Sequence, residues 1–209
     1  MADLKVRHLV VGAVATNCYI AENKKTKEAL IIDPGDNAAR IVQIIKEDGV
    51  VPVAVLLTHG HFDHAMAAQE VAEQYGIKIY AHETEKETLE TPQINLSGMI
   101  GRTLTFHADC YVKDGEILNL AGFEIRVLHT PGHTQGGVCY YNEEENALFS
   151  GYTLLCQSVG RTDFPTGKSS TLIHSIQDKL MPLPDDTMVY TGHEDMTTIG
   201  MERKYNPFL

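Results

Sequence analysis

Three histidines and one aspartate occur within the six residues 59–64, HGHFDH. The apolar run VPVAVLL precedes them and predicts a buried strand that ends near Thr58, and an amphipathic helical segment follows. Because residues two apart in an extended chain face the same side, His59 and His61 can reach one ion. Capping of the next helix would account for Asp63 alone. Imidazole and carboxylate groups at this density indicate a site for zinc or a neighbouring first-row metal.

A second ion is expected if further ligands arrive from elsewhere in the chain. Asp63 and His64 open the next helix, so their side chains diverge in direction from the two preceding histidines. Two later histidines occur in similar settings: His133 follows a predicted strand and a Thr-Pro-Gly turn, and His193 follows a predicted strand and a glycine. Sites collect where strands end in layered α/β folds, so we expect both to approach the first cluster.

Strand-like and helix-like segments alternate along the chain. This order predicts one α/β domain over residues 1–209, in which helices cover two sheets. Gly49 and Gly76 are expected to end helices, Ser169 or Ser170 to cap one, and residues 119–122 to form a hairpin turn. Strands are expected within 8–22, 28–36, 51–59, 77–82, 113–133, 136–151 and 187–194, and helices within 37–49, 63–76, 169–184 and 197–209.

Composition limits the classes of partner. The net charge of −11 argues against binding to nucleic-acid phosphates, which requires basic patches. No apolar run approaches the roughly 20 residues of a membrane helix, and the N-terminal sequence lacks the pattern of a secretory signal. The four cysteines include no C-x-x-C pair and are expected to be free thiols. We therefore expect a cytoplasmic protein that acts on a small molecule; the sequence does not predict its oligomeric state.

The combined motifs resemble the metallo-β-lactamase superfamily over nearly the whole chain. They are H-x-H-x-D-H after a strand, TPGHT at 130–134, FSG at 149–151 and TGH at 191–193. IIDPG at 31–35, GRTDFPTG at 160–167 and the terminal NPFL resemble the glyoxalase II-like branch of that superfamily. The resemblance implies a four-layer αββα sandwich with two metals at one edge.

The resemblance also implies which residues bind metal. Asp33 would be a buried residue that supports the loop bearing the metal ligands. The alternative interpretation is that Asp33 is an ordinary turn residue at the end of a strand. Two zinc ions are the expected cofactor, with iron or manganese as alternatives. The implied ligands of the first ion are His59, His61 and His133, and those of the second are Asp63, His64 and His193.

One residue departs from the family pattern. After FSG the family supplies an aspartate that bridges both metals, whereas this chain has Tyr152. Without that carboxylate the second ion should bind more weakly. Three interpretations stay open: the phenol takes part as a hydrogen-bond donor or metal ligand, the chain is a one-metal or binding-only relative, or the tyrosine is an introduced substitution. Asp63 and Tyr152 are therefore the candidate catalytic residues.

The implied chemistry is hydrolysis by a metal-bound hydroxide. A thiol leaves with a pKa of about 8.5 and needs no strong general acid, which favours a thioester such as an S-acylglutathione. Arg161 and Lys168 are the candidate partners of a substrate carboxylate. The alternative interpretation is that both belong to a solvated loop and bind no substrate. The alternatives to thioester hydrolysis are a lactone or other ester hydrolase, and a metal-binding protein in which Tyr152 impairs catalysis.

Overall fold

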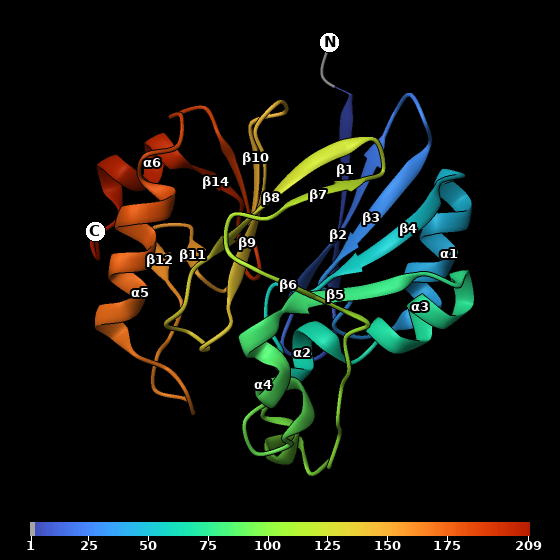
Figure 1. The fold of residues 1–209 in the computed structure, drawn as a ribbon, viewed down its shortest axis with the longest axis horizontal. Helices are drawn as coiled ribbons and strands as arrows, with labels where there is room; N and C mark the ends of the chain where they lie inside the picture. The colour runs from blue at the N-terminus through green and yellow to red at the C-terminus, as the bar shows by residue number, and fades with distance from the viewer. Residues whose placement is uncertain (1–2) are drawn as a thin grey trace.

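Two six-stranded sheets pack face to face, and helices cover the outer face of each sheet (Figure 1). The computed structural model describes residues 3–209. Met1 and Ala2, which fall within the expected domain range, lie outside the described residues. The four-layer αββα arrangement expected from the sequence is confirmed. No helix of residues 3–209 is long and apolar enough to cross a membrane.

The first sheet is built from the N-terminal half of the chain. Its first three strands are antiparallel, and the pairs from β3 to β6 are parallel. Helices α1 (Ala38–Asp48) and α3 (Ala68–Tyr75) cover its outer face. In order across the sheet the strands are β1 (Leu4–Val11), β2 (Thr16–Asn23), β3 (Glu28–Ile32), β4 (Val51–Leu56), β5 (Lys78–His82) and β6 (Cys110–Val112).

The second sheet is built from the C-terminal half and is antiparallel except where β10 pairs with β13. The helical run α5 (Ser169–Ser175) continues as a π-helical turn to Leu180, and α6 (Ile199–Tyr205) packs beside it. A small hairpin joins β11 (Leu154–Leu155) to β12 (Ser158–Val159). In order across the sheet the strands are β14 (Thr197–Thr198), β13 (Met188–Thr191), β10 (Ala147–Gly151), β9 (Val138–Asn142), β8 (Phe123–His129) and β7 (Ile117–Leu120).

Side chains alternate between the two faces of each strand, which gives three apolar layers: one on the outer face of each sheet and one between the sheets. On β4, Val55 faces the helices of the first sheet, whereas Ala54 and Leu56 face the second sheet. On β9, Tyr140 lies between the sheets, and its neighbours on either side pack beneath α5 and α6. Burying a side chain as large as Val55 or Leu56 stabilises the fold by about 1.5–3 kcal/mol. The carboxyl ends of β4 and β10 are thereby fixed at one edge of the sandwich.

The structure differs from the expected elements at the metal loop. The predicted helix over 63–76 is two helices, α2 (Phe62–Ala65) and α3, because the Ala67 N–H donates to the Pro34 carbonyl at 2.9 Å instead of continuing one helix. The expected cap at Ser169 or Ser170 is also wrong, since α5 starts after Lys168 without a side-chain cap. Short helical segments at 83–90 and 97–100 were not predicted.

Candidate metal centre

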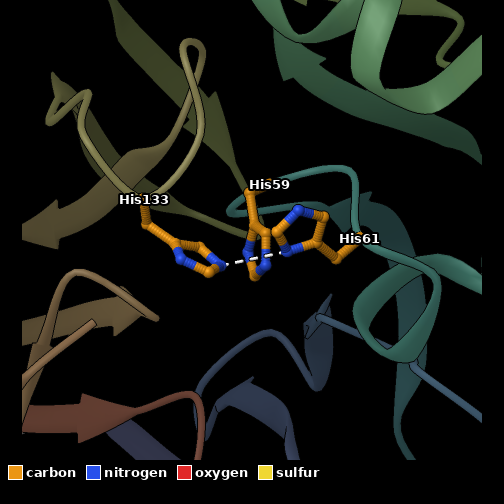
Figure 2. Close-up of side chains that lie close together, drawn as sticks. All are labelled: His59, His61 and His133. Atoms are coloured by element: carbon orange, nitrogen blue, oxygen red, sulfur yellow. Dashed lines mark hydrogen bonds between the residues drawn. The ribbon is translucent and has the colours of Figure 1, made fainter. Parts of the chain in front are cut away.

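The loop after β4 and the loop after β8 bring three imidazoles together. His59, His61 and His133 are buried, and Figure 2 shows the His133 ring directed at His61 with His59 beside both. The His133 Nε2 lies 3.0 Å from the His61 Nδ1, and the His59 ring centroid lies 4.8 Å from each of the other two. One ligand atom from each side chain can lie within 4.8 Å of the other two, close enough for one ion.

A second cluster forms beside the first from α2 and the loop after β13. The Asp63 Oδ2 lies 3.3 Å from the His193 Nε2 and 3.5 Å from the His64 Nε2. The two Nε2 atoms are 3.1 Å apart. The structure thus brings together all six residues that the sequence indicated as ligands, from three separate segments of the chain.

Hydrogen bonds at the outer side of each cluster direct lone pairs inward. The His64 Nδ1 donates to the Asp33 Oδ2 at 2.8 Å, and the His133 Nδ1 donates to the Arg161 carbonyl at 2.7 Å. With the ring proton on Nδ1, the Nε2 of each ring carries a lone pair. The buried His61 Nε2 has no hydrogen-bond partner within the described residues. The facing lone pairs fit a divalent cation in both clusters.

Asp33 links the end of β3 to both the metal loop and the second cluster. Its Oδ1 accepts from the Thr58 N–H at 2.7 Å, and its Oδ2 accepts from the Thr58 hydroxyl at 2.6 Å as well as from His64. The neighbouring Gly35 has no room for a side chain, because a Cβ there would overlap the carbonyl oxygen of Asp63. This placement corresponds to the support role that the resemblance implied.

The protonation states of four of the six proposed ligands suit metal binding near neutral pH. Burial holds the pKa of His59 and of His61 well below the usual value and lowers the pKa of His133 to about 4. Burial by itself raises the pKa of Asp63, but the charge of His64 and the hydrogen bond of His193 outweigh it and hold that pKa well below the usual range. His59, His61, His133 and Asp63 therefore present neutral imidazoles and a carboxylate without first losing protons. His64 differs: burial lowers its pKa, but the carboxylates of Asp63 and Asp33 outweigh burial and raise it, so this ring gives up a proton when its Nε2 binds an ion.

Tyr152 follows β10 and contacts one ring of each cluster. Its ring centroid lies 4.6 Å from that of His133 and 4.9 Å from that of His193. Burial raises the pKa of its phenol, so the group is neutral at pH 7. The residue in the place of the family aspartate is thus positioned at the centre but offers a hydroxyl in place of a carboxylate.

The two basic candidates differ in position. Arg161 lines the cavity above the clusters, but both of its hydrogen bonds to Asp163 measure 2.7 Å and its guanidinium lies 4.1 Å from the centroid of the Phe164 ring. Lys168 is exposed at the start of α5 and is not among the residues that line the cavity. The structure therefore brings Arg161, but not Lys168, to the centre.

Glu85 is a residue of this centre that the sequence did not indicate. Its fully buried carboxylate accepts from the Gly60 N–H at 2.8 Å, the Thr134 hydroxyl at 3.0 Å and the Gly136 N–H at 2.8 Å. Burial raises its pKa to about 7, against the effect of these donors. One side chain thus joins the loop of His59 and His61 to the loop of His133.

Asn17 and Tyr19 hold the last loop in place and were likewise not indicated by the sequence. The Asn17 amide donates to the carbonyls of Thr191 and Glu194 at 3.0 and 2.9 Å, and the Tyr19 hydroxyl donates to the Thr191 carbonyl at 2.7 Å. These bonds fix the chain on either side of His193.

The sequence offered one signal for Glu85, which is its place after a strand. Glu85 follows β5, and β5 neighbours β4 in the parallel part of the first sheet, so both strands end at the edge where the clusters lie.

Comparisons with known proteins agree with this geometry. A family model described as the metallo-beta-lactamase superfamily matches residues 11–193. The chain is 41% identical to "Probable metallo-hydrolase YqgX" of Bacillus subtilis and 38% identical to "Hydroxyacylglutathione hydrolase GloC" of Haemophilus influenzae, each over 99% of this chain and 98% of the relative.

Two solved structures have the same fold at higher than 30% sequence identity. The crystal structure of BLEG-1 B3 metallo-beta-lactamase superposes with a TM-score of 0.94 at 41% identity and covers 98% of this chain and 99% of its own. The structure of TTHA1623 in a di-iron-bound form superposes with a TM-score of 0.86 at 31% identity and covers 97% of this chain and 100% of its own.

Proposed function

The chain belongs to the metallo-beta-lactamase superfamily, and we propose that it is a metal-dependent hydrolase of thioesters such as an S-acylglutathione. The observation that carries the proposal is the convergence of five imidazoles and one carboxylate into two adjacent clusters. The two relatives named as a metallo-hydrolase and a hydroxyacylglutathione hydrolase support the reaction type.

We assign one ion to His59, His61 and His133, and a second to the cluster of Asp63, His64 and His193. When bound, the ions supply Lewis acidity, which makes a water molecule acidic near neutral pH and polarises a carbonyl. Imidazole nitrogens with one carboxylate suit zinc, and the di-iron form of TTHA1623 supports iron as an alternative.

The side chains of this protein orient the reactants and handle protons. The Asp63 carboxylate can accept a hydrogen bond from a water molecule at the centre and thereby fix its direction. Tyr152, as a neutral phenol beside both clusters, can donate a hydrogen bond to an oxygen on which negative charge develops. A thiol with a pKa of about 8.5 leaves as the thiolate without a proton from the enzyme, so these residues suffice for hydrolysis of a thioester.

A second candidate is cleavage of a β-lactam amide, which the likeness to BLEG-1 supports. An amide nitrogen is a poor leaving group and needs a proton as the bond breaks. Tyr152 is the cavity-lining hydroxyl that could supply it. Thioester hydrolysis is favoured because it does not require a residue that protonates the leaving group. Parallel assays of a thioester and a chromogenic cephalosporin decide between the two reactions.

Replacing Tyr152 tests its part in the reaction. We expect Tyr152→Phe, which keeps the ring and removes the hydroxyl, to lower kcat on a thioester about tenfold or more, as loss of a transition-state hydrogen bond does. Tyr152→Asp should raise the occupancy of the second ion, because it adds a charged oxygen ligand, without raising kcat. Metal content by mass spectrometry and kcat with S-D-lactoylglutathione are the measurements. A rise of tenfold or more in kcat for Tyr152→Asp would instead show that tyrosine impairs the centre.

A further inference from the structure

An apolar wall stands above the two clusters. The cavity has a volume of about 700 Å³, and the residues that line it include Val14, Leu96, Met99 and Ile100, a set termed here the apolar wall. Val14 is 49% exposed, Met99 70% and Ile100 44%. Scattered exposed hydrophobic residues are ordinary, but residues from two distant segments that line the same cavity as the six polar side chains of the clusters indicate a binding surface.

The part of the apolar wall at 96–100 is held rigidly. Asn95 is fully buried, and its amide donates to the carbonyls of Leu89 and Leu104 at 3.0 and 2.9 Å, while its side-chain oxygen accepts from the Ser97 N–H at 3.0 Å. Leu96 has a φ of +67°, a conformation that costs a non-glycine residue roughly 1–2 kcal/mol. A loop that bears strain while exposing two large apolar side chains fits a surface kept for a ligand.

One hydrogen bond couples this wall directly to the metal loop. The Phe62 N–H donates to the Asn95 carbonyl at 2.8 Å, and Phe62 lies between His61 and Asp63 in sequence. The apolar wall is therefore held at a fixed position relative to the clusters. A substrate whose carbonyl lies at the clusters would have an adjoining group against the wall.

The charges around the cavity disfavour an anionic group at this position. Arg161 is the one lysine or arginine among the described residues that line the cavity, and Asp163 already neutralises it. Glu194 adds a negative charge to the lining. Apart from the two proposed ions, a substrate carboxylate would therefore find no unpaired cation among the side chains there, whereas an uncharged alkyl group would displace water from apolar surface.

From this geometry we infer that the apolar wall is an acyl subsite for an uncharged alkyl chain of about four to eight carbons. The inference rests on the proposed thioester hydrolysis and narrows it, because it favours alkanoyl over short hydroxyacyl groups. Each methylene that the wall covers contributes to binding of the transition state as well as the substrate, so kcat/KM should rise with chain length.

The test is a series of N-acetylcysteamine thioesters from acetyl to octanoyl, in which the thiol is constant and uncharged. On the zinc-loaded protein we expect kcat/KM to rise about tenfold or more between the butyryl and octanoyl thioesters, since full burial would give roughly fourfold per methylene. S-D-lactoylglutathione should be a poorer substrate than the hexanoyl thioester. Binding of the corresponding non-hydrolysable S-alkyl thioethers, by calorimetry, should follow the same order.

Matched variants locate the effect at the apolar wall. Met99→Ser and Ile100→Ser should each reduce the octanoyl-to-butyryl ratio of kcat/KM about threefold or more. The controls Met201→Ser on α6 and Ile117→Ser on β7 remove exposed side chains of the same kind, 46% and 41% exposed, away from the cavity lining, and should leave that ratio unchanged. Because all four side chains are exposed, none of the variants should prevent folding.

The outcomes separate the inference from the function on which it rests. Hydrolysis of every thioester with no dependence on chain length, or a ratio insensitive to Met99 and Ile100, would overturn the acyl subsite and leave thioester hydrolysis intact. Absence of hydrolysis throughout would overturn the proposed function. In that case the calorimetry still decides the inference, since alkyl thioethers that bind without chain-length dependence contradict it.

Discussion

We expect replacement of His59 by alanine to abolish hydrolysis and to remove at least one equivalent of metal per chain. His59 belongs to two of the three groups of side chains that could hold an ion, because it contacts the rings of His61, His64 and His133. Loss of its nitrogen leaves two imidazoles, too few to fix an ion with an open position. The expected loss in kcat/KM is about a thousandfold, or roughly 4 kcal/mol.

The matched control for this variant is His107→Ala, whose side chain is 66% exposed and contacts Glu90 on the surface. Metal content by mass spectrometry and kcat/KM should both stay at the wild-type level in the control. Unchanged hydrolysis in His59→Ala would refute the assignment of the first ion.

The second large effect is expected from Asp33→Asn. The amide has the size of the carboxylate, but its –NH₂ group would replace one of the two oxygens that bind Thr58 and His64. If –NH₂ faces His64, the ring must carry its proton on Nε2, where it can no longer bind metal. We expect the affinity for the second ion to fall about 10–100-fold, and the thermal stability to fall because a buried donor loses its acceptor.

Titration of the metal-free protein with zinc measures this effect, and the comparison is with Asp36→Asn. Asp36 lies three residues further along and is partly exposed, and its carboxylate accepts a hydrogen bond from the N–H of its neighbour Asn37. Its amide variant should bind two ions with wild-type affinity. Equal zinc affinities for the two variants would show that Asp33 does not orient His64.

The sequence predicted the parts of the centre that depend on local geometry. The spacing of His59 and His61 and the strand ends before His133 and His193 place their side chains by rules that act over a few residues. Periodicity and a closing glycine likewise predicted a helix within 37–49 that ends at Gly49, and α1 lies there.

Long-range contacts explain what the sequence did not predict. The carboxylate of Glu85 bridges two loops that are 74 to 76 residues apart, and nothing in HETEKET distinguishes it from the exposed glutamates around it. The break between α2 and α3 depends on the Pro34 carbonyl, which belongs to another strand end. Asp163 neutralises Arg161 because the two side chains adopt rotamers in which the guanidinium donates two hydrogen bonds to the carboxylate.

The central claim is that six side chains from three segments bind two ions at one edge of the sandwich. Anomalous diffraction at the zinc edge, from crystals of the zinc-loaded protein, tests it most directly. We predict a strong peak about 2.0–2.1 Å from nitrogens of His59, His61 and His133. A second peak should lie at a similar distance from Asp63, His64 and His193, and it should be weaker because Tyr152 supplies no bridging carboxylate. Anomalous peaks at other residues, with none within bonding distance of these six, would contradict the account.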